Sequence, residues 1–140
     1  MSIKKIAIII FAFCFMLFKS NNSAAQRSIR THAIHWEIES AKDLTSNKNF
    51  VFECSFETSS TQVKWNQKKS NQLFVYNISE SIGEWSDVEE RGSFILIVSD
   101  EYGLTELLFK RNLLGVSIEL STIDAGIKTP KYLFTVSKVE

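Results

Sequence analysis

The sequence contains few of the residues that usually carry metal or covalent chemistry. Its 140 residues include 2 cysteines, 2 histidines and 1 proline. His32 and His35 are three positions apart, so on a strand their side chains point to opposite faces and cannot serve as two ligands of one ion. The only other soft ligand beyond the N-terminal segment is Cys54. We therefore expect neither a metal site nor a cofactor.

Apolar runs of membrane-spanning length are also lacking. The longest run covers residues 6–18, which is 13 residues, whereas a spanning helix needs about 20. Lysines precede this run and small residues follow it, up to Ala25. This order is typical of a secretory signal peptide. We expect residues 1–25 to be cleaved, leaving one domain over residues 26–140 that is secreted or periplasmic and has no stable membrane span.

Removal of the signal peptide changes the cysteine count and the charge of the chain. Cys14 leaves with it, so Cys54 is the single cysteine of the mature chain and no intrachain disulfide can form. Three of the 16 basic residues leave as well, so 13 basic residues stand against 16 acidic ones, a formal charge of −3. This acidic balance makes nucleic acid an unsuitable partner.

The remaining sequence is rich in apolar residues that alternate with polar ones. Hydrophobic residues make up 44% of the chain and 11 residues are phenylalanine, a globular composition. The clearest alternation lies in residues 50–57, and residues 91–121 read as a meander of three strands. The pattern predicts strands over 32–39, 50–57, 62–66, 73–78, 94–98, 104–110, 113–120 and 132–139, with a short edge strand over 84–88.

The short connections between these strands predict an all-β fold with antiparallel pairing, because parallel strands need crossovers of a dozen or more residues. We expect an antiparallel β-sandwich of about eight strands, with a small lipocalin-like β-barrel as the alternative. The inward-facing phenylalanines suit a sandwich core, and they suit a barrel lined for a ligand equally well. They are Phe50, Phe52, Phe56, Phe74, Phe94, Phe109 and Phe134.

Aromatic residues in polar surroundings are the best candidates for ligand contact. Trp85 and Tyr102 lie in segments expected to be loops, and Trp65 lies among amides and lysines, although its alternation also suits a core position. Such rings beside polar groups favour a non-enzymatic binding module for a glycan or a protein surface outside the cytoplasm.

Two other functions compete with this one. A barrel would suit a carrier of a small apolar ligand, whereas a carboxylate-dependent hydrolase would use acidic residues of the loops. The acidic residues are Glu84, Asp87, Glu89, Glu90, Asp100 and Glu101. No pair of them has a defined spacing, so we expect no enzyme. Asn77 begins the triplet Asn-Ile-Ser, a glycosylation sequon in a host that modifies exported proteins.

Overall fold

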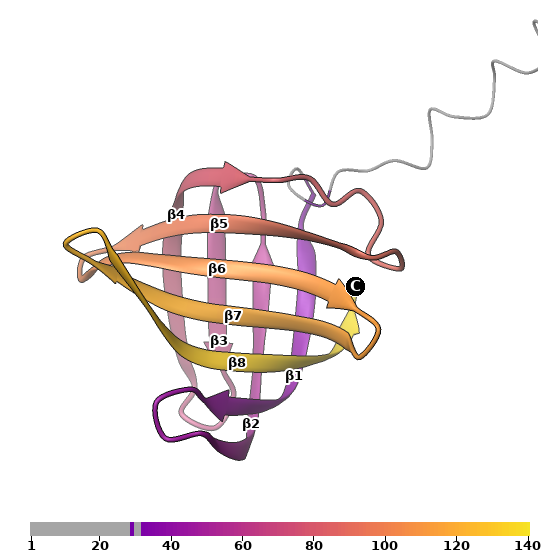
Figure 1. Cartoon of the computed structure of the whole chain (residues 1–140), viewed down its shortest axis with the longest axis horizontal. Helices are drawn as coiled ribbons and strands as arrows, with labels where there is room; N and C mark the ends of the chain where they lie inside the picture. Colours follow the sequence, from indigo (N-terminus) through magenta and orange to yellow (C-terminus); the bar gives the residue numbers. More distant parts are fainter. Residues whose placement is uncertain (1–28, 30–31) are drawn as a thin grey trace, which may run out of the picture.

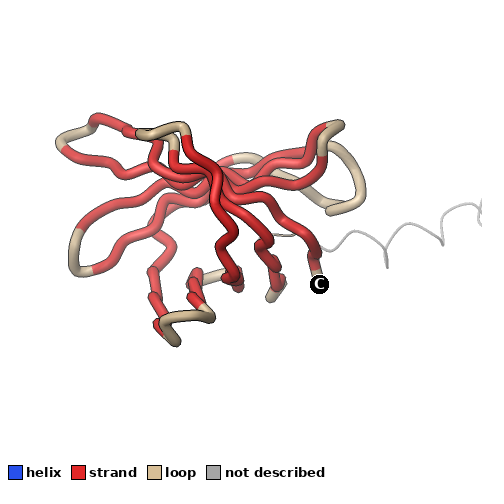
Figure 2. Tube along the Cα trace, turned by 90° about the horizontal axis from the view of Figure 1, so that it is seen from below, coloured by secondary structure: helices blue, strands red, loops and turns tan. Residues whose placement is uncertain are grey.

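The computed structural model describes residue 29 and residues 32–140, whose regular elements are all β-strands. Figure 2 shows this part of the chain as strands and loops alone, and nothing within it forms a helix able to cross a membrane. The predicted signal peptide, residues 1–25, lies outside the described residues. The eight strands are β1 (Ile34–Asp43), β2 (Lys48–Thr58), β3 (Gln62–Gln67), β4 (Gln72–Ile82), β5 (Gly92–Asp100), β6 (Gly103–Asn112), β7 (Gly115–Asp124) and β8 (Ile127–Val139).

The strands form a closed barrel in which each strand pairs with the next and β8 pairs with β1, always antiparallel. In Figure 1, β5 to β8 cross the front of the barrel and β1 to β4 run steeply behind them. The all-β prediction is confirmed, the predicted sandwich is wrong, and the barrel alternative is confirmed. Alternation decides which face of a strand is buried, but it does not decide whether the first and last strands meet.

Three local predictions differ from the structure. Residues 84–88 lie in the loop between β4 and β5 and form no strand. The expected loop over residues 121–130 is a tight hairpin, because Ala125 and Gly126 both have positive φ, 48° and 78°, as a two-residue primed turn requires. Leu113 and Leu114 belong to the turn between β6 and β7 rather than to a strand.

Irregularities in strand register accompany the closure of the barrel. The pairing register shifts in β1 between Ile38 and Ser40 and in β4 between Ile78 and Glu80. It also shifts near Pro130, which faces Ser121 within β8. An extra residue bends a strand and increases its twist, and such a site tolerates the missing proline N–H. These bulges explain how eight strands curve into a closed wall.

The aromatic side chains inside the barrel form two clusters, one near each end. The capped-end cluster lies beneath the loop between β4 and β5, and the open-end cluster lies near the four hairpin turns that join β1–β2, β3–β4, β5–β6 and β7–β8. The capped-end cluster comprises Trp36, Trp85, Phe94 and Phe109. The open-end cluster comprises Phe50, Phe52, Phe56, Trp65, Phe74, Tyr132 and Phe134.

The two clusters differ in how well they are sealed. All four rings of the capped-end cluster are buried, and the backbone N–H of Ile29 donates to the carbonyl of Trp85 over this end. In the open-end cluster Phe50 is 38% exposed, and Phe52 and Tyr132 are only partly buried. The barrel is therefore closed at one end and accessible at the other.

Candidate ligand-binding site

The accessible end of the barrel contains a small aromatic pocket of about 180 Å³. Its position follows from alternation, because β2, β3 and β8 each send every second side chain inward at this end. The aromatic pocket is lined by Phe50, Phe52, Trp65, Gln67, Tyr132 and Phe134. Five of these six side chains are aromatic, so the site offers mainly apolar contact and a single amide.

The rings of the aromatic pocket hold one another in place. Trp65 lies parallel to the buried Phe56 ring, with centroids 5.5 Å apart and an interplanar angle of 6°. It meets Phe52 edge-on at 6.2 Å and Phe134 edge-on at 5.8 Å. Stacked and edge-to-face pairs at these distances stabilise each other beyond simple burial. The Trp65 ring is therefore fixed as one wall of the pocket before any ligand binds.

The indole N–H of Trp65 is buried, and no oxygen or nitrogen atom of the described residues accepts a hydrogen bond from it. Its neighbour is the Cys54 thiol, whose pKa the indole lowers as a hydrogen-bonding group. Sulfur is a weak acceptor, so this contact satisfies the indole less well than an oxygen would.

Cys54 lies on the same face of β2 as Phe52 and Phe56 and is fully buried. Burial raises the pKa of its thiol to about 11, and the neighbouring Trp65 indole opposes this shift to a smaller extent. The thiolate needed for nucleophilic attack is therefore scarce at neutral pH. Cys54 acts as a small apolar side chain beneath the aromatic pocket.

The raised pKa of Cys54 predicts a loss of stability between about pH 9 and pH 11. The ordinary thiol pKa is 9.0, so in this window the unfolded chain releases a proton that the folded chain retains. Unfolding is then favoured as pH rises, by up to roughly 3 kcal/mol once the pH passes the folded-state pKa. Urea unfolding at pH 8 and pH 10.5 should show a larger loss for the wild type than for Cys54→Ala. Equal losses in the two proteins would contradict the assignment.

A polar cluster on the outside of the barrel links β1 to the turn between β3 and β4. The Glu37 carboxylate pairs with the Lys68 ammonium and accepts a hydrogen bond from His35 Nε2 at 2.9 Å. These contacts, with Lys68 first, lower the pKa of Glu37. The cluster tethers the turn next to Gln67, which forms part of the aromatic pocket's rim.

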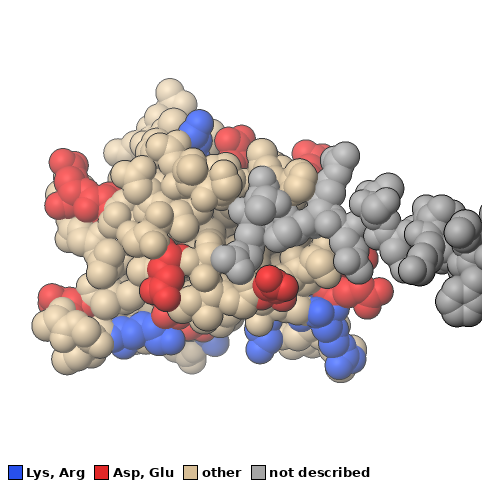
Figure 3. All heavy atoms as spheres, turned by 90° about the horizontal axis from the view of Figure 1, so that it is seen from above, with Lys and Arg blue, Asp and Glu red and all other residues tan. Residues whose placement is uncertain are grey.

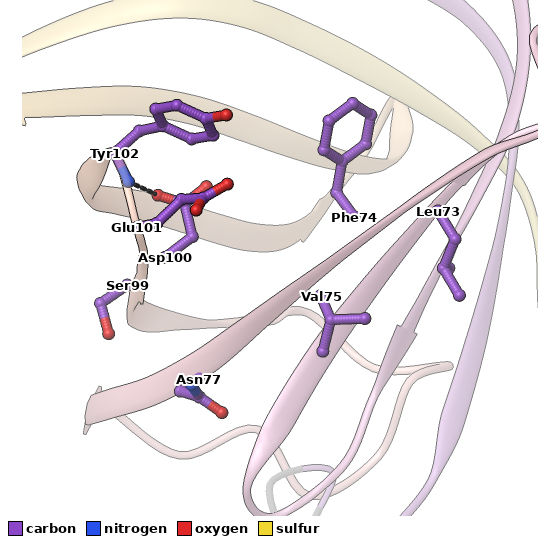
Figure 4. Close-up of a pocket in the computed structure, with 8 residues that line it drawn as sticks. All are labelled: Leu73, Phe74, Val75, Asn77, Ser99, Asp100, Glu101 and Tyr102. Atoms are coloured by element: carbon purple, nitrogen blue, oxygen red, sulfur yellow. Dashed lines mark hydrogen bonds between the residues drawn. The ribbon is translucent and has the colours of Figure 1, made fainter.

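A second hollow, the β4 groove, lies in the gap of the barrel wall between β4 and the turn that joins β5 to β6, and side chains from both faces of β4 line it. It has a volume of about 400 Å³. Figure 4 shows the Tyr102 ring and the acidic side chains of the turn on one side and the β4 side chains on the other. The β4 groove is lined by Leu73, Phe74, Val75, Asn77, Ser99, Asp100, Glu101 and Tyr102.

The three aromatic residues predicted to contact a ligand occupy separate places. Trp65 lines the aromatic pocket, and Tyr102, which is 87% exposed, lines the β4 groove. Trp85 was expected in an exposed loop but is only 3% exposed, because its indole folds onto Trp36 and its Nε1 donates to the carbonyl of Glu90 at 3.0 Å. The rings therefore do not form one flat surface.

The acidic residues predicted from the sequence divide between the two ends of the barrel. Glu84, Asp87, Glu89 and Glu90 belong to the loop between β4 and β5, whereas Asp100 and Glu101 lie at the opposite end, where β5 meets β6. Two of them shape turns: Asp87 accepts the backbone N–H of Glu89, and Asp100 accepts that of Tyr102. The described residues contain no group of acidic, histidine or cysteine side chains arranged to hold a metal ion.

The outer surface combines both signs of charge. On the face drawn in Figure 3, lysine and arginine side chains lie mainly along one margin and acidic side chains are scattered over the rest. Asn77 is exposed on β4, where its Oδ1 accepts a hydrogen bond from Gln62 Nε2 at 3.5 Å. The sequon asparagine thus stands at the edge of the β4 groove.

Comparison of the chain with family models, with curated proteins and with solved structures finds no match.

The aromatic pocket could be predicted from the sequence only in part. Alternation gave the inward faces of Phe50 and Phe52, but the meeting of β2, β3 and β8 around one hollow depends on closure of the barrel.

Proposed function

We propose that this chain is an exported, non-enzymatic binding protein that holds a small apolar ligand at the open end of its barrel. The observation that carries the proposal is the aromatic pocket, with five rings, one amide and a hollow of about 180 Å³. Ligand sites in proteins are typically concave and mostly apolar, with few polar groups that fix orientation. In this proposal Gln67 is the orienting group.

The volume of the aromatic pocket limits the size of the ligand. An apolar cavity of about 150 Å³ in another protein accommodates benzene, so a hollow of 180 Å³ suits a single ring or the end of an aliphatic chain. Flat rings pack well against the Trp65 face and the neighbouring phenylalanines. A small aromatic compound is therefore the preferred class of ligand. The chain would act as its carrier or receptor outside the cytoplasm.

Filling the aromatic pocket should abolish binding. Gln67→Trp places a large side chain at the rim, whereas Val51→Trp adds the same side chain at an outward position of β2 that is 81% exposed. With indole as the probe, we expect a rise in the unfolding temperature and chemical-shift changes at the pocket rings for the wild type and for Val51→Trp. Gln67→Trp should show neither effect.

Native mass spectrometry of protein purified from its own host provides the second measurement. We expect a bound mass of roughly one small aromatic molecule in the wild type, since a drug-sized ligand exceeds this hollow. The proposal is overturned if Gln67→Trp responds to indole as the wild type does. It is overturned equally if the wild type ignores indole and carries no ligand mass.

A further inference from the structure

The two edges of β4 are paired over different lengths. On one side β4 pairs with β3 from Gln72 to Asn77. On the other side its pairing with β5 begins only at Asn77, which faces Ser99. Residues 72–76 therefore have a strand neighbour on one side only, and the β4 groove lies along the unpaired side.

The backbone direction of β4 shows which groups face the β4 groove. The N–H of Ile78 donates to the carbonyl of Thr61, 2.9 Å away, on the β3 side. Backbone groups alternate sides along a strand, so those of Leu73 and Val75, like those of Asn77, point away from β3. Two N–H and two C=O groups thus face the groove without a ladder partner. An unpaired edge of this kind is a template for another strand.

The side chains around this edge are apolar and exposed. Leu73 is 58% exposed, Val75 is 43% exposed and Tyr102 is 87% exposed. In Figure 4 the Tyr102 ring lies across the hollow from the Phe74 ring, whereas Leu73 and Val75 point to the other side of β4. A strand bound here would place alternate side chains against these surfaces, as in other cases of strand addition.

The charge of the β4 groove sets the orientation of the bound strand. Asp100 and Glu101 are among its lining residues, and no lysine or arginine is. One oxygen of Asp100 accepts the N–H groups of Tyr102 and Gly103, which leaves the other oxygen for a ligand. A strand antiparallel to β4 would begin beside these carboxylates, because β4 runs toward Asn77 and Ser99. A positive charge at the start of that strand would complement them.

We propose that the free edge of β4 binds an extended apolar segment of another protein by antiparallel strand addition, with a positively charged N-terminal end held at Asp100 and Glu101. The site is separate from the aromatic pocket, which opens inside the barrel. Recognition comes from backbone hydrogen bonds at Leu73 and Val75, from apolar contact with Tyr102 and from the two carboxylates.

A synthetic peptide tests the backbone pairing. The probe is the peptide Lys-Val-Thr-Val-Thr with a free amino terminus. The control peptide has the same sequence, but the backbone N–H groups that would face β4 are N-methylated. We expect the parent peptide to slow hydrogen exchange at the amides of Leu73 and Val75, and the methylated peptide to lose at least tenfold in affinity. Equal binding of the two peptides, or amides already protected in the free protein, overturns the proposal.

Variants of the protein test the same edge. Val75→Pro removes an N–H that points away from β3, so it should spare the β3–β4 ladder and weaken peptide binding about tenfold, whereas Val75→Thr should bind normally. Asp100→Asn with Glu101→Gln should weaken binding and reduce its salt dependence. Unchanged affinity in Val75→Pro overturns the proposal. The proposal is also overturned if the free wild type forms a dimer and Val75→Pro abolishes it, because a second copy of the chain would then occupy the β4 edge.

Discussion

Replacing Trp36 with alanine is expected to lower the free energy of unfolding by about 4 kcal/mol. Trp36 is fully buried and is the centre of the capped-end cluster. Its ring centroid lies 4.9 Å from that of Phe109, 5.9 Å from Trp85 and 6.4 Å from Phe94. Alanine would remove all three contacts and leave a cavity that the barrel wall cannot easily fill.

The Trp36 indole also satisfies a buried hydroxyl. Its Nε1 donates to Thr58 Oγ1 at 3.0 Å, across the β1–β2 pair. Trp36→Phe retains a ring but leaves this hydroxyl without its donor, so we expect a smaller loss of about 1–2 kcal/mol. Urea unfolding measures both variants, and Tyr102→Ala, an exposed aromatic truncation, should change stability by less than about 0.5 kcal/mol. A loss below about 1 kcal/mol for Trp36→Ala would contradict a packed capped end.

Replacing Gly92 with alanine is expected to cost about 3 kcal/mol through a clash with the Trp85 ring. A Cβ at Gly92 would lie 2.3 Å from Cδ1 of Trp85 and 2.8 Å from its Cγ. The indole is held by its hydrogen bond to the Glu90 carbonyl and is buried against Phe94, so it has little room to move. The φ angle of Gly92 lies outside the positive range, so contact rather than backbone strain causes the loss.

A double-mutant cycle isolates this clash. In a Trp85→Leu background the indole is absent, so Gly92→Ala should then cost well under about 1 kcal/mol. Ser93→Ala, at the exposed neighbouring position, is the matched control and should be nearly neutral. Urea unfolding of the four proteins gives the coupling free energy. If alanine costs the same in both backgrounds, the close approach of Trp85 to residue 92 is not its cause.

The two ends of the barrel differ in packing, and under the proposed function this difference separates stability from ligand binding. At the capped end the aromatic rings are buried and the start of β1 pairs with the end of the chain, as His35 and Glu140 exchange backbone hydrogen bonds of 2.9 Å. At the open end Phe50 is 38% exposed, and the buried Trp65 N–H has the Cys54 thiol, a weak acceptor, beside it. Substitutions at the capped end should therefore affect unfolding, whereas those around the aromatic pocket should affect binding more strongly.

Much of the strand content was predictable because alternation is a local property. Phe52, Cys54 and Phe56 face inward together, since side chains two apart on a strand share one side. The same rule applied to residues 32–39 turns Trp36 inward, and in the structure it is 0% exposed. Residues 94–98 are an exception: their apolar side chains are continuous rather than alternating, which is typical of a strand buried on both faces, but Ile95 and Ile97 are only half-buried on the outside.

The position of Trp85 was not predictable from local pattern. Its neighbours in sequence are polar, so it resembles an exposed loop residue. The ring is buried because the loop between β4 and β5 folds back over the barrel end, where Gly92 leaves space for it. This contact depends on the positions of β4 and β5, the strands that flank the loop. A periodic pattern in the sequence does not predict those positions.

By itself, the sequence determined that this chain forms antiparallel strands, which side chains each strand turns inward, and that one buried cysteine remains outside the predicted signal peptide. Only the tertiary structure decided that β8 meets β1, that the inward rings separate into a sealed cluster and an accessible pocket, and that the first half of β4 has no strand neighbour on its β5 side. The physical reason is that alternation acts between residues two apart, whereas closure and register depend on bulges and on pairing between distant strands.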